Sequence, residues 1–216
     1  MSTGVLILGE SGTGKSTSMR NLNPEETFII RVIDKPLPFK GWKNKYLNED
    51  MIRSKVSDST DKIVSWMNQI SEKKPEIKTI IIDDAQYLMS NEFMRKSSEK
   101  GYDKFTDIAK HFWDVMNASG KLRDDLVVVV MSHTEMDEYG KMKIKTVGKL
   151  TDKMITPEGL FTIVLFTEVE DGNYYFITQN NGNNTAKSPL GMFEEAKIDN
   201  DLAVVIETLK KYNEED

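Results

Sequence analysis

The residues whose types and spacing most clearly suit chemistry stand near the start of this sequence. The segment Gly9-Glu10-Ser11-Gly12-Thr13-Gly14-Lys15-Ser16 fits the pattern G-x-x-x-x-G-K-[ST], and it directly follows the apolar run 5–8. This pattern is typical of a loop whose successive backbone N–H groups point at phosphate oxygens. The sequence therefore predicts a phosphate-binding loop, and the expected nucleotide contacts are Gly9, Glu10, Ser11, Gly12, Thr13, Gly14, Lys15, Ser16 and Thr17.

Two side chains of this loop have expected roles of their own. We expect the Lys15 ammonium to reach the β- and γ-phosphates and assist catalysis, and the Ser16 hydroxyl to ligate Mg²⁺. We also expect a helix over about 14–21, because its positive N-terminal end would attract the same anion.

A second candidate group stands at the end of the apolar run 80–82. Asp83 and Asp84 come directly after it. A strand here would deliver both acids to the carboxyl edge of a parallel sheet, where ligands bind. We expect Asp83 to hold Mg²⁺ through its water shell, which makes Mg²⁺-ATP the predicted ligand. Asp84 either orients or deprotonates the attacking water, or it caps a following helix.

Asp34 is an equal candidate for the acid that activates water. It ends a predicted strand over 27–33, which points toward the same edge. The alternative is that Asp34 only forms a turn before Lys35-Pro36.

A polar pair, Ser132 and His133, follows the apolar run 126–131. If this strand lies between the other two, its end lies beside the γ-phosphate. Either residue would then sense the state of the phosphate, and we count His133 among the catalytic candidates. The alternative is a polar strand end in solvent, whereas His111 is expected to be structural.

The segment 141–153 is the most basic stretch of an acidic chain, with five lysines and one acid. In a strand, alternation would place three of the lysines on one face. Such a face would bind a nucleic-acid backbone, reach the nucleotide of a neighbouring subunit, or protect an edge strand from aggregation. The candidate contacts are Lys141, Lys143, Lys145 and Lys149.

The elements that must position these residues alternate between strand and helix, which predicts an α/β fold with a mostly parallel sheet flanked by helices. Helices are expected over 60–71 and around 105–116, where apolar residues recur at helical spacing. Asp171-Gly172 between two strand-like runs predicts an antiparallel hairpin extension over about 159–180. A last helix is expected over about 199–213, and residues 1–216 are expected to form a single domain.

Composition excludes several classes of protein. No run approaches the roughly 20 apolar residues of a membrane helix, so we expect no membrane partner and a cytoplasmic location. The absence of cysteine excludes disulfides and thiolate chemistry, and two histidines argue against a histidine-rich metal site. The net charge of −6 argues against a uniformly basic nucleic-acid surface.

Together, the segments 9–16, 34–39, 80–84 and 127–133 resemble the RecA-like P-loop ATPases of phages and bacteria. More narrowly, the chain is similar to the short, core-only ATP-binding proteins of phages linked to single-strand annealing and recombination. The resemblance implies a RecA-type core, ATP and Mg²⁺, assembly into rings or filaments, and single-stranded DNA as a partner. It also implies a glutamate as the water-activating acid, whereas the candidates in this sequence are aspartates.

The leading hypothesis is therefore an ATPase that couples ATP to the binding of single-stranded DNA, as an accessory protein in phage DNA recombination. One alternative is a slow nucleotide-dependent switch or virion assembly factor that ignores DNA. The other is a nucleotide kinase, although the five arginines form no cluster of the kind that a kinase lid carries. None of them stands in a recognisable finger motif, and Lys149 or Lys187 would have to substitute.

Overall fold

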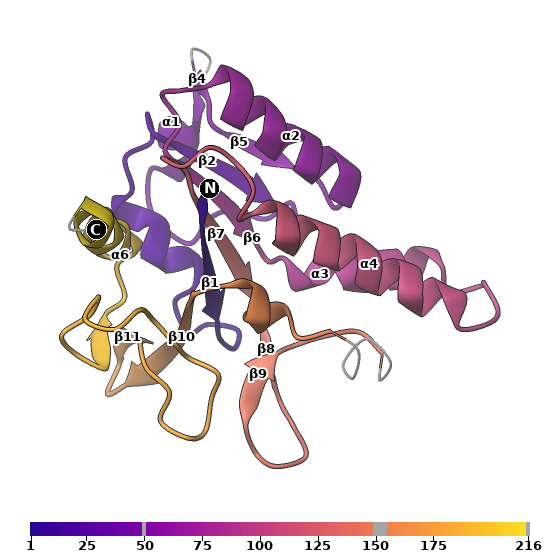
Figure 1. Ribbon diagram of the computed structural model, residues 1–216. Helices are drawn as coiled ribbons and strands as arrows, with labels where there is room; N and C mark the ends of the chain where they lie inside the picture. The colour runs from indigo at the N-terminus through magenta and orange to yellow at the C-terminus, as the bar shows by residue number, and fades with distance from the viewer. Residues whose placement is uncertain (49–50, 149–154, 215–216) are drawn as a thin grey trace.

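Eight strands form one central sheet in the order β12-β11-β10-β1-β7-β6-β2-β5 (Figure 1). The computed structural model describes residues 1–48, 51–148 and 155–214. From β10 to β5 all neighbouring strands run parallel, whereas β11 and β12 are antiparallel. The strands are β1 (Thr3–Leu8), β2 (Thr27–Arg31), β5 (Ser54–Val56), β6 (Thr79–Asp83), β7 (Val127–Ser132), β10 (Ile163–Glu170), β11 (Asn173–Ile177) and β12 (Lys197–Asp199). The predicted α/β fold is confirmed.

The strand β7 lies between β1 and β6, which is the arrangement on which the sensor prediction depended. Val129 of β7 is paired with Val5 on one side and with Ile81 on the other. All six residues of β7 are buried, because both faces of the sheet are covered and a run of β-branched residues fills both.

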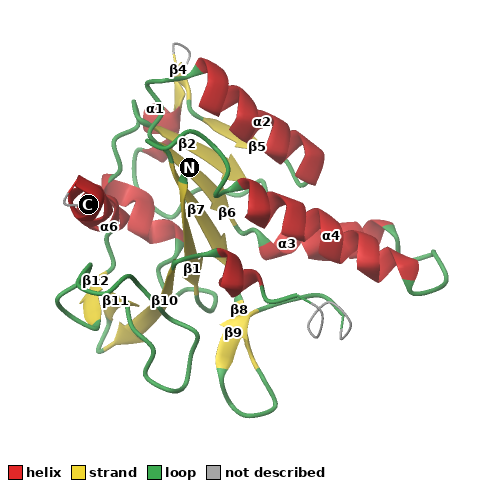
Figure 2. Ribbon diagram, viewed as in Figure 1, coloured by secondary structure: helices red, strands yellow, loops and turns green. Residues whose placement is uncertain are grey.

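Helices cover both faces of the sheet (Figure 2), and alternate residues of each strand pack against opposite layers of helices. Ile80, Ile82 and Val128 pack with helices α2 (Thr60–Lys73), α3 (Gln86–Arg95) and α4 (Asp103–Ala118). Val5, Ile81 and Val129 pack with the 3₁₀ segment η1 (Ser16–Asn21) and with helices α1 (Trp42–Tyr46) and α6 (Leu202–Glu214). The helices predicted over 60–71, around 105–116 and over about 199–213 are confirmed.

The predicted hairpin is present, and the strand β12 lies outside it at the edge of the sheet. Strands β10 and β11 are joined by Asp171 and Gly172, whose φ values of 50° and 78° are both positive. Such a turn matches the right-handed twist of the flanking strands. The first half of β10 also pairs in parallel with β1, so this strand belongs to the core of the sheet as well as to the hairpin.

The segment after the phosphate-binding loop differs from its prediction. It is a six-residue 3₁₀ segment instead of an α-helix over 14–21. Four of its residues are Ser, Thr or Asn, whose side chains compete for backbone hydrogen bonds, and Ser18 Oγ donates to the Lys15 carbonyl at 2.6 Å. Since so short a segment has little macrodipole, attraction for phosphate must come from the loop N–H groups and from lysine.

Two segments between these elements contain further secondary structure. The segment between β2 and α2 holds α1, the antiparallel pair β3 (Leu47–Asn48) and β4 (Met51–Ile52), and the edge strand β5. After β7, the strands β8 (Thr134–Met136) and β9 (Met142–Ile144) form a small hairpin, and a 3₁₀ turn, η2 (Pro157–Leu160), follows. Within the described residues, no helix has the length and apolar character needed to cross a membrane.

Candidate nucleotide-binding site

A cleft of about 290 Å³ lies at the carboxyl ends of the parallel strands β1, β2, β6 and β7. It brings together residues from the phosphate-binding loop, from the segment after β2, from the ends of β6 and β7, and from β11. The lining residues are Ser11, Gly12, Gly14, Lys15, Ser16, Thr17, Lys35, Pro36, Pro38, Asp84, His133 and Tyr174.

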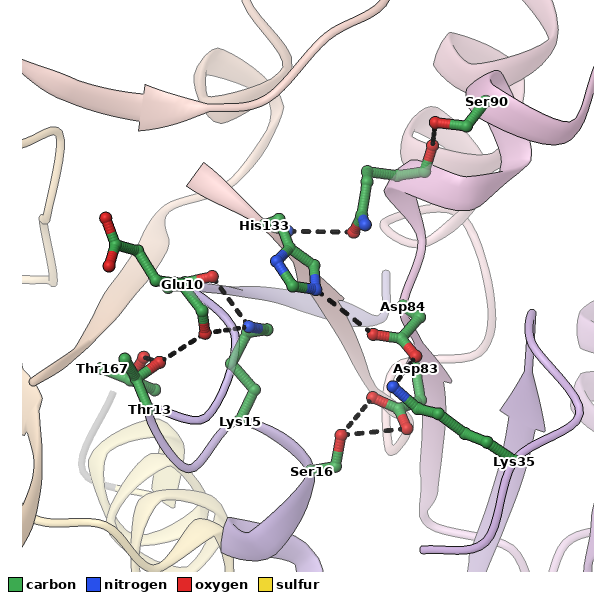
Figure 3. A network of polar contacts seen from close by, with 12 residues as sticks. Glu10, Thr13, Lys15, Ser16, Lys35, Asp83, Asp84, Ser90, His133 and Thr167 are labelled. Atoms are coloured by element: carbon green, nitrogen blue, oxygen red, sulfur yellow. Dashed lines mark hydrogen bonds and ion pairs between the residues drawn. The ribbon is translucent and has the colours of Figure 1, made fainter. Parts of the chain in front are cut away.

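The loop conformation depends on its glycines and on β10. Gly12 and Gly14 have φ values of 81° and 97°, which side chains rarely allow. A Cβ at Gly9 would overlap the Thr167 hydroxyl. That hydroxyl lies 2.5 Å from Thr13 Oγ1, which fastens the loop to β10 (Figure 3).

Lys15 is held inside the loop. Its Nζ donates to the carbonyls of Gly9 and Glu10, each at 2.7 Å, and the residue is 6% exposed. Burial lowers the pKa of Lys15 to about 8, while the charges of Asp84 and Asp83 act in the opposite direction. The ammonium is therefore mostly protonated at pH 7, as phosphate binding requires.

Ser16, which lines the cleft, is paired with the buried carboxylate of Asp83. Ser16 Oγ donates to Asp83 Oδ1 at 2.8 Å, and its distance to Oδ2 is 3.1 Å. Burial, followed by the charge of Asp84, raises the pKa of Asp83 to about 6. A hydroxyl and a carboxylate fit Mg²⁺, which takes oxygen ligands and usually keeps several waters and substrate phosphates. Among the described residues there is no cluster of three or more His, Cys, Asp or Glu that could hold a metal ion.

Figure 3 shows Asp84 linked to both His133 and Lys35. Its φ of 62° is in the left-handed region, an uncommon conformation for a residue other than glycine and one that clusters at functional sites. Its carboxylate is 3% exposed, forms an ion pair with Lys35, and lies 3.6 Å from His133 Nε2. Burial acts to raise the pKa of Asp84, but hydrogen bonds from His133 and Lys35 hold it below its usual range. The residue that caps α3 is Ala85, so the alternative of Asp84 as a helix cap is not realised.

His133 connects the cleft to the hairpin that follows it. Its backbone N–H donates to Gln86 Oε1 at 3.1 Å, and its carbonyl accepts from Lys145 N at 2.8 Å. The Ser132 side chain is fully buried instead, and its hydroxyl has no hydrogen-bond partner in the described part of the chain. Of the two sensor candidates, His133 is the one that lines the cleft.

Asp34, the other candidate base, does not line the cleft. Its side chain is 79% exposed, and it accepts from Arg31 Nη1 at 3.1 Å. His111 lies on α4 and contacts Glu92 at 2.9 Å, as expected for a structural residue.

Residues 142–144 of the basic segment form β9, which pairs with β8 in a hairpin, so of the described lysines in this segment only Lys143 lies in a strand. Lys143 is paired with Glu135 across the two strands, and their side chains lie 3.7 Å apart. Ile144 is buried, and its N–H donates to Glu158 Oε1 at 2.9 Å. Lys141 is half-buried and Lys145 is exposed, whereas Lys149 lies outside the described residues. Glu135 therefore offsets part of the positive charge of this hairpin.

Sequence reasoning missed several residues that the fold brings to the site. Lys35 and Tyr174 line the cleft, and Gln86 holds the backbone of His133. For Lys35, the sequence did offer an indication. It comes directly after a predicted strand whose carboxyl end was expected to lie at the edge where ligands bind.

A comparison with family models matches residues 2–190 to a family described as an AAA domain. A comparison with curated proteins finds no match.

Proposed function

This chain belongs to an AAA domain family of P-loop ATPases, and from that premise we propose that it hydrolyses ATP with Mg²⁺ as cofactor. The observation that carries the proposal is the Asp84 carboxylate, which lies in the same cleft as the Lys15 ammonium and the pair of Ser16 with Asp83. Phosphoryl transfer needs mainly positioning and electrostatic stabilisation, and these groups supply both.

The reaction assigns a role to each group. A water oxygen bonds to the γ-phosphorus while the bond from that phosphorus to the β–γ bridging oxygen breaks, which gives ADP and inorganic phosphate. Asp84 orients the water and accepts its proton, and its low pKa keeps it ionised for this task. The loop N–H groups and Lys15 bind the phosphate oxygens. Ser16 and Asp83 would hold Mg²⁺, which offsets phosphate charge when bound.

The test compares three variants. We expect Lys15→Ala to abolish ATP binding, because the ammonium contacts the phosphates. We expect Asp84→Asn to bind ATP normally and to lose about 10²-fold or more in kcat, as removal of a general base does. Asp34→Asn is the matched control and should hydrolyse ATP at the wild-type rate. Calorimetry and phosphate release measure the two steps. Unchanged hydrolysis in Asp84→Asn would exclude Asp84 as the base, and normal binding in Lys15→Ala would overturn the site.

A second proposal is that ATP controls the binding of single-stranded DNA, as the resemblance to phage recombination ATPases implies. It is supported by the hairpin β8–β9, which begins next to His133 and is hydrogen bonded to the His133 carbonyl. A change at the γ-phosphate would pass from Asp84 to His133 and then to the lysines of the hairpin.

We expect the double variant Lys141→Ala/Lys145→Ala to weaken binding to an oligonucleotide and to reduce its salt dependence, because phosphate contacts release counterions. Lys73→Ala/Lys74→Ala, on α2 and just beyond it, is a control with the same change of charge. Sedimentation with a non-hydrolysable ATP analogue would report DNA binding and the expected homo-oligomer together. Tight ATP binding with no DNA binding at low salt would instead favour a nucleotide switch, and phosphate transfer to nucleosides would favour a kinase.

A further inference from the structure

We propose that Lys35 binds the terminal phosphate of the nucleotide during hydrolysis, as a second lysine supplied from within the same chain. This inference rests on the proposed ATPase function and adds a residue to its site. In other ATPases, a finger residue from a neighbouring subunit stabilises the charge on the terminal phosphate. We assign this function to Lys35 of the same chain.

The position of Lys35 is the first observation. Its side chain lines the cleft together with Lys15 and Ser16, and its ammonium forms an ion pair with Asp84 (Figure 3). The Lys35 side chain is 47% exposed, whereas Asp84 is almost fully buried. Lys35 can therefore move to a phosphate oxygen at the mouth of the cleft while Asp84 stays in place.

The local sequence directs the Lys35 side chain toward the cleft. Arg31 donates from Nη1 to the Lys35 carbonyl at 2.9 Å and to Asp34 at 3.1 Å. These bonds hold the Asp34 carboxylate beside Arg31 and fix the Lys35 backbone, and Pro36 restricts the conformation of the residue before it. Adjacent residues thus have different surroundings, with Asp34 exposed and Lys35 at the nucleotide.

The charges in the cleft favour an anion between the two lysines. Lys15 and Lys35 both line this cleft, so two ammonium groups of like charge face the same space and repel each other. Lys15 is fixed by the Gly9 and Glu10 carbonyls, whereas within the described residues the Lys35 ammonium is paired with the Asp84 carboxylate, which the reaction needs. A terminal phosphate bound by both would relieve the repulsion and leave Asp84 free to accept the proton of water.

Lys35 takes no part in bond making. It keeps its proton and stabilises the charge on the γ-phosphate oxygens as the bond to the bridging oxygen breaks, and this charge develops most fully in the transition state. Its contribution should therefore appear in kcat and in the affinity for a transition-state analogue, and not in the affinity for ADP.

The test uses Lys35→Ala, Lys35→Arg and the control Lys40→Ala. Lys40 lies on the same loop, is exposed and is absent from the lining of the cleft. We expect Lys35→Ala to bind Mg²⁺-ADP within about threefold of wild type and to lose about 10²-fold in kcat and in affinity for ADP with aluminium fluoride. Lys35→Arg should restore part of both, and Lys40→Ala should match wild type.

The outcomes separate this inference from the function on which it rests. Equal losses for ADP and for ADP with aluminium fluoride would give Lys35 a structural role only and overturn the inference, as would a wild-type kcat in Lys35→Ala. Failure of the wild-type protein to bind any nucleotide would instead overturn the proposed function.

A mixing experiment tests whether Lys35 acts on the nucleotide of its own chain or on that of a neighbouring subunit. Lys15→Ala cannot bind nucleotide and Lys35→Ala lacks the second cation, so each is inactive alone. Because Lys35 acts on the nucleotide of its own chain, a mixture of the two variants should remain inactive at high protein concentration. Recovery of activity would show that Lys35 acts across subunits.

Discussion

The buried carboxylate of Asp83 lowers the free energy of unfolding of the protein. Asp83 is fully buried next to a second carboxylate, and its pKa of about 6 lies above the value of 3.8 for an unperturbed aspartate. Because the folded state binds this proton more tightly than the unfolded state, ionised Asp83 destabilises the fold above pH 6. The destabilisation declines as the pH falls from 6 to 4.

We predict that Asp83→Asn stabilises the protein in the absence of nucleotide. A rise of about two pKa units corresponds to an upper limit of about 3 kcal/mol at pH 7.5, and the gain should vanish near pH 4. Chemical denaturation at both pH values, with a chelator present, measures the difference. Asp124→Asn, at an exposed position, should change nothing, and a gain that does not depend on pH would contradict the explanation.

The helix α6 shows how an element outside the family match contributes to the same core. The match ends at residue 190, whereas α6 spans Leu202–Glu214. Leu202, Val205 and Leu209 are buried against the face of the sheet that carries Val5 and Val129, and η1 packs in the same layer. The prediction of a single domain over 1–216 thus requires α6 to unfold together with the sheet.

We predict that Leu209→Ala lowers the free energy of unfolding by about 2–5 kcal/mol, the usual cost of truncating a buried leucine. Val204→Ala is the matched control on the same helix, because Val204 is 50% exposed. Urea denaturation followed by circular dichroism measures both. If Leu209→Ala costs no more than the control, or α6 melts in a separate transition, residues 1–216 do not fold as one unit.

For the molecule as a whole, the two-sided burial of the sheet explains where the site must lie. Helices cover both faces, so the carboxyl ends of the parallel strands are left as the edge where loops from distant segments meet (Figure 2). The phosphate-binding loop, Lys35, Asp84 and His133 each follow a different strand of this sheet. The order of the strands in the sheet therefore brings four segments that are distant in the sequence together around one cleft.

The sequence by itself determined the features that depend on neighbouring residues. The glycine pattern at 9–16, the acidic end of β6, the periodicity of α2 and α4, and the Asp171-Gly172 turn are local signals, because backbone conformation and the burial of one face act over a few residues.

Only the tertiary structure decided which residues share the cleft. Asp34 and Asp84 are equivalent as strand-end acids in the sequence, but Arg31 holds Asp34 at the surface while Lys35 and His133 surround Asp84. In the sequence, Lys35 precedes Asp84 by 49 positions and His133 follows Asp84 by 49 positions. Contacts at such separations are set by strand order and by the paths of loops, which no local pattern encodes.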